Sequence, residues 1–146
     1  MSSLITSLIT ARWFGLVARI ALTFMFWASG IAKLVDFDNA MAEMAHFGLF
    51  PAAPFALAVA LTQLIGAALI ITNRWTWLGA GMLGVFTALT IPIAHPFWTM
   101  DEPMRTLEFY VVMEHLTVIG ALMVVAWKSA PDHRAATAGE AGLAGA

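Results

Sequence analysis

Four long apolar stretches constrain the fold more than any other feature of the sequence. They cover residues 13–32, 55–72, 77–94 and 107–127. Each has roughly 18–21 residues, enough for a helix to cross a hydrocarbon core of about 30 Å. Each is apolar nearly all round, which is typical of helices in contact with lipid. Charged residues make up only 11% of the chain, too few to cover the surface of a soluble domain. We therefore predict an all-α fold, a four-transmembrane-helix antiparallel bundle.

The connections between these stretches have their own signals. Asp36 or Asp38 can cap a short amphipathic helix over residues 41–47, and Gly48 can end it. We expect this helix to lie in the headgroup region, in the first outer loop. Residues 73–76 form a tight turn between the second and third spans, and the proline-containing segment 92–98 must break the third helix.

The positions of Lys and Arg predict an orientation. With four spans both termini share one side of the membrane. That side carries Arg12, Arg74, Lys128 and Arg134, against Lys33 and Arg105 on the other. By the positive-inside rule both termini are cytoplasmic, and we expect a multi-pass protein of the bacterial cytoplasmic (inner) membrane. Three regions follow: an interfacial segment over residues 1–12, the membrane domain over 13–128 and a disordered tail over 129–146.

Composition excludes several classes of function. The chain has no cysteine, so it cannot form disulfides, thiolate metal sites or thiol-based catalytic centres. Its net charge is −2 and it has no basic run, which argues against a nucleic-acid partner. No phosphate loop, nucleophile elbow or zinc-protease pair occurs. This pattern favours a protein with no catalytic activity of its own.

Polar residues inside the spans are the candidates for a site. A charge in hydrocarbon costs about 2.5–3.5 kcal/mol, so it faces the interior, finds a partner or reaches back to the interface. An intramembrane cluster of this kind is expected from Arg19, Gln63, Glu114 and His115. Helical rise places the first three at ~9, ~13 and ~20 Å from the cytoplasmic ends of their spans. The cluster could clamp the helices together or bind a ligand, and Arg19 could instead extend to the interface.

A second group lies near the outer face, namely Lys33, His95, Trp98 and Glu108. A quinone head group is a candidate ligand, because its carbonyls accept hydrogen bonds from His, Arg or Lys. Its ring could lie against Phe97, Trp98, Phe109 and Tyr110, although such aromatics at a membrane interface more often act as anchors. His95, Glu108 and His115 could also ligate a metal. These three residues form no closely spaced His-x-x-x-His or Glu-x-x-His pair on one helix, so we expect no metal site.

Three segments resemble the DoxX family of small four-helix membrane proteins. They are Arg19 followed by residues 30–38, residues 63–75, and residues 95–98 together with 114–121. The resemblance spans about residues 15 to 128. Relatives often carry a carboxylate in place of Gln63 and Lys-Asn in place of Glu114-His115. The family is named for a subunit of a thiosulfate:quinone oxidoreductase, so the resemblance implies a small membrane protein, in some cases associated with oxidoreductase or oxidative-stress assemblies.

Three functions are compatible with these observations. The first is a non-catalytic subunit or assembly partner of a membrane complex, whose partner would be another membrane protein or a second copy. The second is a quinone-binding membrane subunit of an oxidoreductase. The third is a small-solute carrier, with Arg19, Gln63 and Glu114 lining the path.

Overall fold

The computed structural model describes the backbone of residues 3–144 and the side chains of residues 3–130. Within residues 3–144 the chain is all-helical. The elements are α1 (Ser3–Thr10), α2 (Arg12–Leu22), α3 (Phe24–Val35), α4 (Phe37–His46), α5 (Ala52–Ile71), α6 (Thr76–Ala94), the 3-10 helix η1 (Phe97–Thr99) and α7 (Met104–Ala144). In this part of the chain three segments are long and apolar enough to cross a membrane: α5, α6 with η1, and α7 as far as Ala130. The number is four if α1 and α2, which meet at 59°, form one span.

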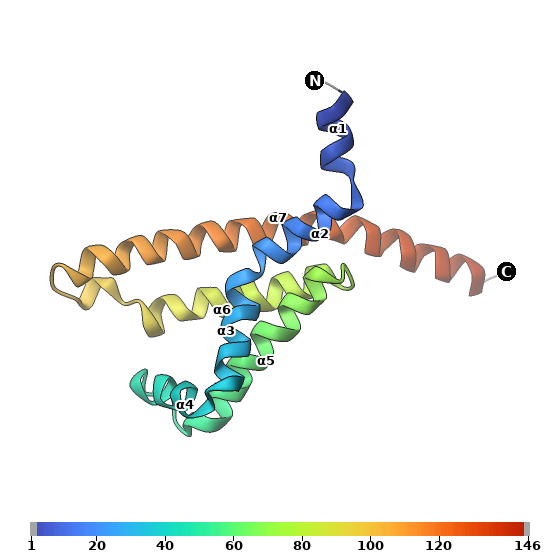
Figure 1. The fold of residues 1–146 in the computed structure, drawn as a ribbon. Coiled ribbons are helices and arrows are strands. Elements are labelled where there is room, and N and C mark those ends of the chain that lie inside the picture. Colours follow the sequence, from blue (N-terminus) through green and yellow to red (C-terminus); the bar gives the residue numbers. More distant parts are fainter. Residues whose placement is uncertain (1–2, 145–146) are drawn as a thin grey trace.

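The helices follow one another in an open row (Figure 1). α3 packs on α5, α5 on α6, and α6 on α7, while α4 folds back against α5. α7 lies alongside α6 for most of its membrane length, and among the described residues it has no comparably extensive contact with α3 or α5. The all-helical membrane fold predicted from the sequence is confirmed, whereas the four-helix antiparallel bundle is not.

The first predicted span is two helices rather than one. Thr23, which is fully buried, separates α2 from α3. Its hydroxyl donates to the carbonyl of Arg19 at 2.8 Å, and the indole N–H of Trp27 donates to the carbonyl of Ile20 at 3.4 Å. Side chains that bond back to the preceding turn in this way bend a helix. The expectation of one continuous helix over residues 13–32 is corrected accordingly.

The amphipathic helix expected after the first span is present as α4. The carboxylate of Asp36 accepts a hydrogen bond from the backbone N–H of Asn39 at 3.1 Å, which caps the first turn. Gly48 follows the helix with a positive φ of 73°, a conformation that glycine adopts without strain. The apolar face of α4 buries Ala40 and Met44 against Ala56 of α5.

Two glycines bring α5 and α6 into close contact. A Cβ added to Gly79 would lie 2.6 Å from the carbonyl oxygen of Gly66, too close for any side chain. The main core cluster lies beside this contact and contains Ile70 and Leu83. The α5–α6 hairpin is therefore held by direct backbone approach, as is common where small residues meet between membrane helices.

The third span ends where Pro96 requires it. Proline disfavours helical backbone in the residue before it, and α6 ends at Ala94 with His95 as its C-cap. Pro92 lies inside α6 and does not end it. At the other end of the chain, α7 continues to Ala144 through most of the segment predicted as a disordered tail. That segment is rich in alanine, the strongest helix former; residues 145–146 lie outside the described part of the chain.

Candidate functional site

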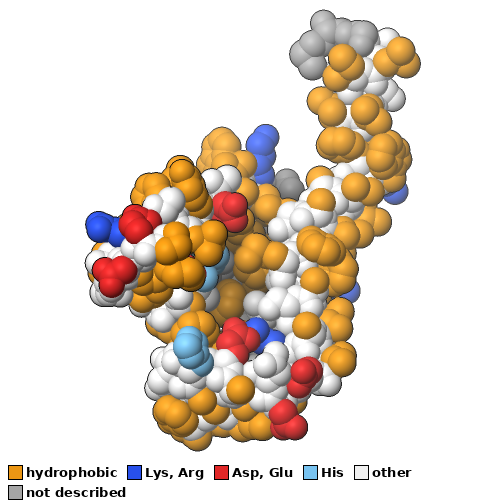
Figure 2. All heavy atoms as spheres, turned by 60° about the vertical axis from the view of Figure 1, so that its left-hand side comes forward, with side chains coloured by type: hydrophobic (Ala, Val, Ile, Leu, Met, Phe, Trp, Pro, Cys, Tyr) orange, Lys and Arg blue, Asp and Glu red, His pale blue; other side chains and the backbone are white. Residues whose placement is uncertain are grey.

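A cleft of about 450 Å³ lies between α3, α4, α5 and α6, and α7 reaches it through His115. Figure 2 shows the hollow between the column formed by α2 and α3 and the block formed by α6 and α7. The helices α3, α5 and α6 each contribute residues three or four positions apart, which share one helical face. The polar residues that line the cleft are Ser29, Lys33, Glu43, Gln63, Thr87, Thr90, His95 and His115. The remaining lining residues are apolar and include Phe47, Phe55 and Phe86.

The amide side chain that lines the cleft belongs to Gln63, and 5% of the surface of this residue is exposed. Its Nε2 donates to the hydroxyl oxygen of Ser29 at 3.3 Å. Its Oε1 is buried and has no hydrogen-bond partner among the described residues. A buried carbonyl without a partner costs about 1–3 kcal/mol. The oxygen can only accept a hydrogen bond, so a ligand would have to bring a donor to it.

Two threonines of α6 form part of the opposite wall. The hydroxyl of Thr87 donates to the carbonyl of Leu83 at 2.7 Å, and that of Thr90 donates to the carbonyl of Thr87 at 2.8 Å. Their protons are used within the helix, so each hydroxyl oxygen faces the cleft as an acceptor only. The site residues predicted from the sequence did not include Ser29, Thr87 or Thr90. The four-residue spacing of Ser29 and Lys33 in one apolar span could have indicated that Ser29 lies on the same helical face as Lys33.

The two histidines meet at the outer end of the cleft. Nδ1 of His95 lies 2.6 Å from Oε2 of Glu108. Nδ1 of His115 lies 2.8 Å from the carbonyl oxygen of Val111, one turn earlier on α7. The two imidazole rings pack edge to face with centroids 4.8 Å apart. Glu108, which does not line the cleft, thereby acts on it through His95.

Lys33 and Glu43 join two elements across the mouth of the cleft. Nζ of Lys33 lies 2.5 Å from Oε2 of Glu43, which links α3 to α4. The lysine side chain is 13% exposed and the glutamate side chain 40%. The ion pair neutralises both charges where they line the cleft, so the cleft has polar groups but little net charge at this end.

Besides Glu108, the predicted site residues that do not line the cleft are Arg19, Trp98 and Glu114. The expected cluster of Arg19, Gln63 and Glu114 is not joined by any hydrogen bond or ion pair among the described residues. Nε of Arg19 is buried without a partner, and its guanidinium lies near Gly15, one turn back toward the start of α2. This is the course of an arginine reaching toward the interface. Glu114 is exposed on α7. Trp98 is 53% exposed and its ring packs edge to face on Phe97.

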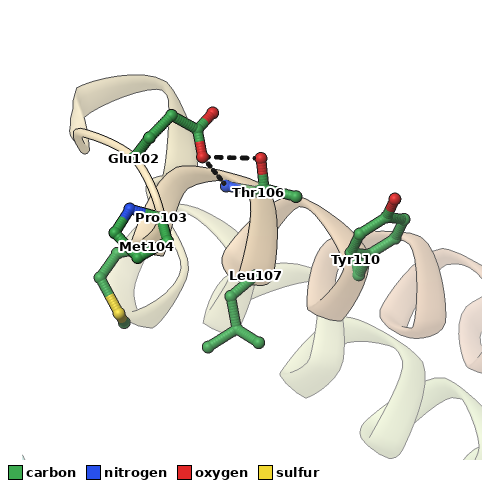
Figure 3. Close-up of a pocket in the computed structure, with 6 residues that line it drawn as sticks. All are labelled: Glu102, Pro103, Met104, Thr106, Leu107 and Tyr110. Atoms are coloured by element: carbon green, nitrogen blue, oxygen red, sulfur yellow. Dashed lines mark hydrogen bonds between the residues drawn. The ribbon is translucent and has the colours of Figure 1, made fainter.

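A second hollow, of about 520 Å³, lies at the start of α7. Figure 3 shows its residues, all of which are exposed. The carboxylate of Glu102 is turned toward Thr106, where it accepts hydrogen bonds from the backbone N–H at 3.3 Å and from the hydroxyl at 2.7 Å. The carboxylate thus stabilises the first turn of α7, and none of the predicted site residues lies here. Within the described residues, no group of three or more His, Asp or Glu side chains could hold a metal ion.

The helices that form most of the cleft lie in a segment that matches a known protein family. Residues 14–96, more than half of the chain, match the DoxX family model. The chain belongs to the DoxX family. The match covers α3, α4, α5 and α6, which form most of the cleft of this DoxX protein, and ends before α7. Beyond the family, no curated protein and no solved structure gives a significant match.

Proposed function

We propose that this DoxX protein is a subunit of a membrane complex and that its own task is to hold a quinone, in its oxidised or reduced (quinol) form, in the cleft beside Gln63. The observation that carries the proposal is the Gln63 amide: the residue lines the cleft, and its buried Oε1 lacks a partner within the described residues. A hydroxyl of the quinol form can donate a hydrogen bond to this oxygen. An apolar cavity with a few convergent polar groups is the usual form of a small-molecule site.

The size and lining of the cleft support a quinone. Its volume of about 450 Å³ falls within the range of ~300–1,000 Å³ found for ligand pockets. Phe47, Phe55 and Phe86 provide aromatic surface for a ring, and Ser29 and Lys33 carry hydrogen-bond donors for its carbonyls. Figure 2 shows that the cleft is open at the molecular surface, so a long apolar tail could extend into the lipid.

The subunit role is supported by Glu114. This carboxylate is exposed near the middle of the membrane length of α7, and no described residue forms a hydrogen bond or ion pair with it. A carboxylate in contact with lipid is costly, whereas a donor from another membrane protein would satisfy it. Tyr110 and Thr117, four residues before and three after, lie on the same helical face and are also exposed.

The location that we propose is the bacterial cytoplasmic membrane, with both termini on the cytoplasmic side. The proposal takes α2 and α3 as the two halves of the first span. Arg12 at the start of α2 and Arg74 between α5 and α6 then lie on the cytoplasmic side, as the excess of positive charge requires. The cleft end that holds His95 faces outward.

The test is the content of the purified protein. The protein is extracted gently from bacterial membranes, and organic extracts of the wild type and of Gln63→Met are analysed by mass spectrometry. We expect quinone or its quinol in the wild type and about a tenfold lower amount in Gln63→Met, equivalent to the lost hydrogen bond from a quinol hydroxyl to Oε1, about 1.4 kcal/mol. Thr72→Val is the control, since Thr72 is exposed at the end of the same helix and bonds only to its own backbone. Extracts that contain phospholipid and no quinone would contradict the proposal.

A further inference from the structure

We infer that His95 and Glu108 form a proton-accepting pair, so that the cleft binds the reduced, hydroxyl-bearing form of its ligand in preference to the oxidised form. The inference rests on the proposed function and names the chemical form of the ligand: a quinol, or a phenol of similar shape. It is carried by the hydrogen bonds that fix the protons of two neighbouring imidazoles.

The contact with Glu108 fixes the tautomer of His95. A carboxylate accepts hydrogen bonds and cannot donate one, so Nδ1 of His95 carries the proton across the 2.6 Å contact. The other ring nitrogen, Nε2, then has a free lone pair. His95 lines the cleft and therefore offers an acceptor to a ligand hydroxyl.

His115 has the same tautomer for a different reason. Its Nδ1 lies 2.8 Å from the carbonyl oxygen of Val111, which can only accept, so this nitrogen also carries the proton. Nε2 of His115 is again an acceptor. With ring centroids 4.8 Å apart, the two histidines concentrate acceptors at one end of the cleft. A quinone carbonyl cannot donate to an acceptor, whereas a quinol hydroxyl can.

Glu108 gives His95 a charged partner that His115 lacks. When Nε2 of His95 takes a proton, the O–H bond of the ligand breaks, an N–H bond forms, and the ligand remains as a phenolate with no change in oxidation state. The carboxylate of Glu108 stabilises the resulting imidazolium, as in other His–carboxylate pairs. His115 has a neutral carbonyl in the same position and gains no such stabilisation. Its role is to accept a hydrogen bond.

Other charged groups that line the cleft do not disturb this pair. They are Lys33 on α3 and Glu43 on α4, and they neutralise each other in one ion pair. The polar residues that α5 and α6 contribute before His95 are Gln63, Thr87 and Thr90, none of which titrates. The side chain of Glu108 is 16% exposed, so the pair can exchange its proton with water at the outer surface.

The experiment compares the affinities of a decyl-substituted benzoquinol and the matching quinone for the full-length protein in lipid nanodiscs. Binding is measured at about pH 8 without oxygen. We expect the wild type to prefer the quinol by about tenfold, because the quinol hydroxyls can donate to the Nε2 acceptors and the quinone carbonyls cannot.

Glu108→Gln separates this inference from the proposed function. Glutamine can still accept from Nδ1 of His95 but cannot stabilise an imidazolium. The Nε2 acceptors remain, so we expect the quinol preference to fall about threefold rather than to vanish, with quinone affinity unchanged. The control is Glu102→Gln, since the carboxylate of Glu102 bonds to Thr106 away from the cleft. A preference that is undiminished in Glu108→Gln overturns the inference and leaves quinone binding intact. If the wild type binds neither form, the proposed function itself fails.

Quinone affinity also reports whether the variant is folded. If Glu108→Gln loses both ligands, the wild type decides the question with the dimethyl ether of the quinol, which has a similar shape and no hydroxyl proton. Equal affinities for the quinol and its ether would then overturn the inference.

Discussion

Nδ1 of His95 lies 2.6 Å from Oε2 of Glu108, a contact that ties the end of α6 to the first part of α7 across the intervening 3-10 helix. The two residues are close because Pro96 ends α6 directly after His95. Both side chains are mostly buried, at 24% and 16% exposed. We therefore expect the contact to stabilise the fold as well as to accept a proton from a ligand.

Replacing His95 by alanine should reduce stability. Hydrogen bonds to charged groups contribute about 1.5–3 kcal/mol, and their loss leaves the Glu108 carboxylate half-buried without its partner. We expect His95→Ala to lower the free energy of unfolding in detergent by about 1–3 kcal/mol. His46→Ala is the matched control, because His46 is exposed at the end of α4 and should change stability by less than about 0.5 kcal/mol. Equal effects of the two variants would show that the His95–Glu108 contact does not stabilise the fold.

Replacing Gln63 by methionine should leave the stability of the fold unchanged or raise it slightly. Methionine has a similar volume, and the substitution removes both the 3.3 Å bond to Ser29 and the unpaired buried Oε1. Ser29 lines the cleft and is partly exposed, so water can replace its lost partner, and removing the unpaired buried oxygen is then neutral or stabilising. We therefore expect thermal unfolding of Gln63→Met, freed of ligand, at or slightly above the wild-type temperature.

This result would distinguish a ligand site from a structural clamp. If Gln63 served mainly to hold α3 and α5 together, Gln63→Met and Ser29→Ala would both destabilise the protein. Stability retained in both variants, together with weakened quinone binding in Gln63→Met, would support a site kept for binding at some cost in stability.

Replacing Gly79 by alanine should disrupt the α5–α6 contact. The added Cβ would lie 2.6 Å from the carbonyl oxygen of Gly66 and 2.9 Å from Cβ of Leu69. Backbone cannot yield as a flexible side chain does, so the helices must separate. Overpacking of this kind costs about 1–3 kcal/mol, measurable by thermal or denaturant unfolding in detergent.

Gly81 offers the control on the same helix. A Cβ there would meet nothing within 4 Å, and alanine is the better helix former by about 0.5–1 kcal/mol. Gly81→Ala should be neutral or stabilising. A Gly79→Ala protein as stable as Gly81→Ala would mean that the close approach of the two helices does not constrain the fold.

The sequence predicted the fold at the level of its elements. Apolar length located the second, third and fourth spans, and Asp36 and Gly48 bounded α4 correctly, because these features depend on local chemistry. The division at Thr23 was missed, since threonine is common in apolar helices and its bond to Arg19 O is visible only in three dimensions. The open row of helices was missed as well, because four apolar helices can pack in several ways.

The candidate site was predicted in parts but not as one unit. Depth alone placed Gln63 and His115 in an inner group and Lys33 and His95 in an outer group, yet the structure brings all four to one cleft. Depth was a poor guide because helix rotation, which the sequence does not specify, decides which side chains meet. The hydroxyls of the cleft were overlooked because a threonine in a membrane helix usually bonds to its own backbone.

Glu114 leads to the last prediction, which concerns assembly. Transferring a carboxylate to the lipid-facing surface of a helix costs about 2.5–3.5 kcal/mol on insertion scales. Within the described residues nothing offsets this cost. A membrane helix of a partner that presents a cation or a hydrogen-bond donor at the same depth would do so, and the exposed Tyr110 and Thr117 would extend the contact along one face.

We therefore expect Glu114→Leu to be at least as stable as the wild type in isolation, because the lipid-facing charge is gone. The same variant should lose its partner from gently solubilised membranes, with at least a tenfold drop in the complex seen by native mass spectrometry. Met123→Leu is the control, since Met123 is 67% exposed on the same helix and its replacement leaves the polar face intact. A Glu114→Leu protein that keeps its partner would show that this face is not the contact. A wild type found alone, with no second subunit or second copy, would contradict the subunit role.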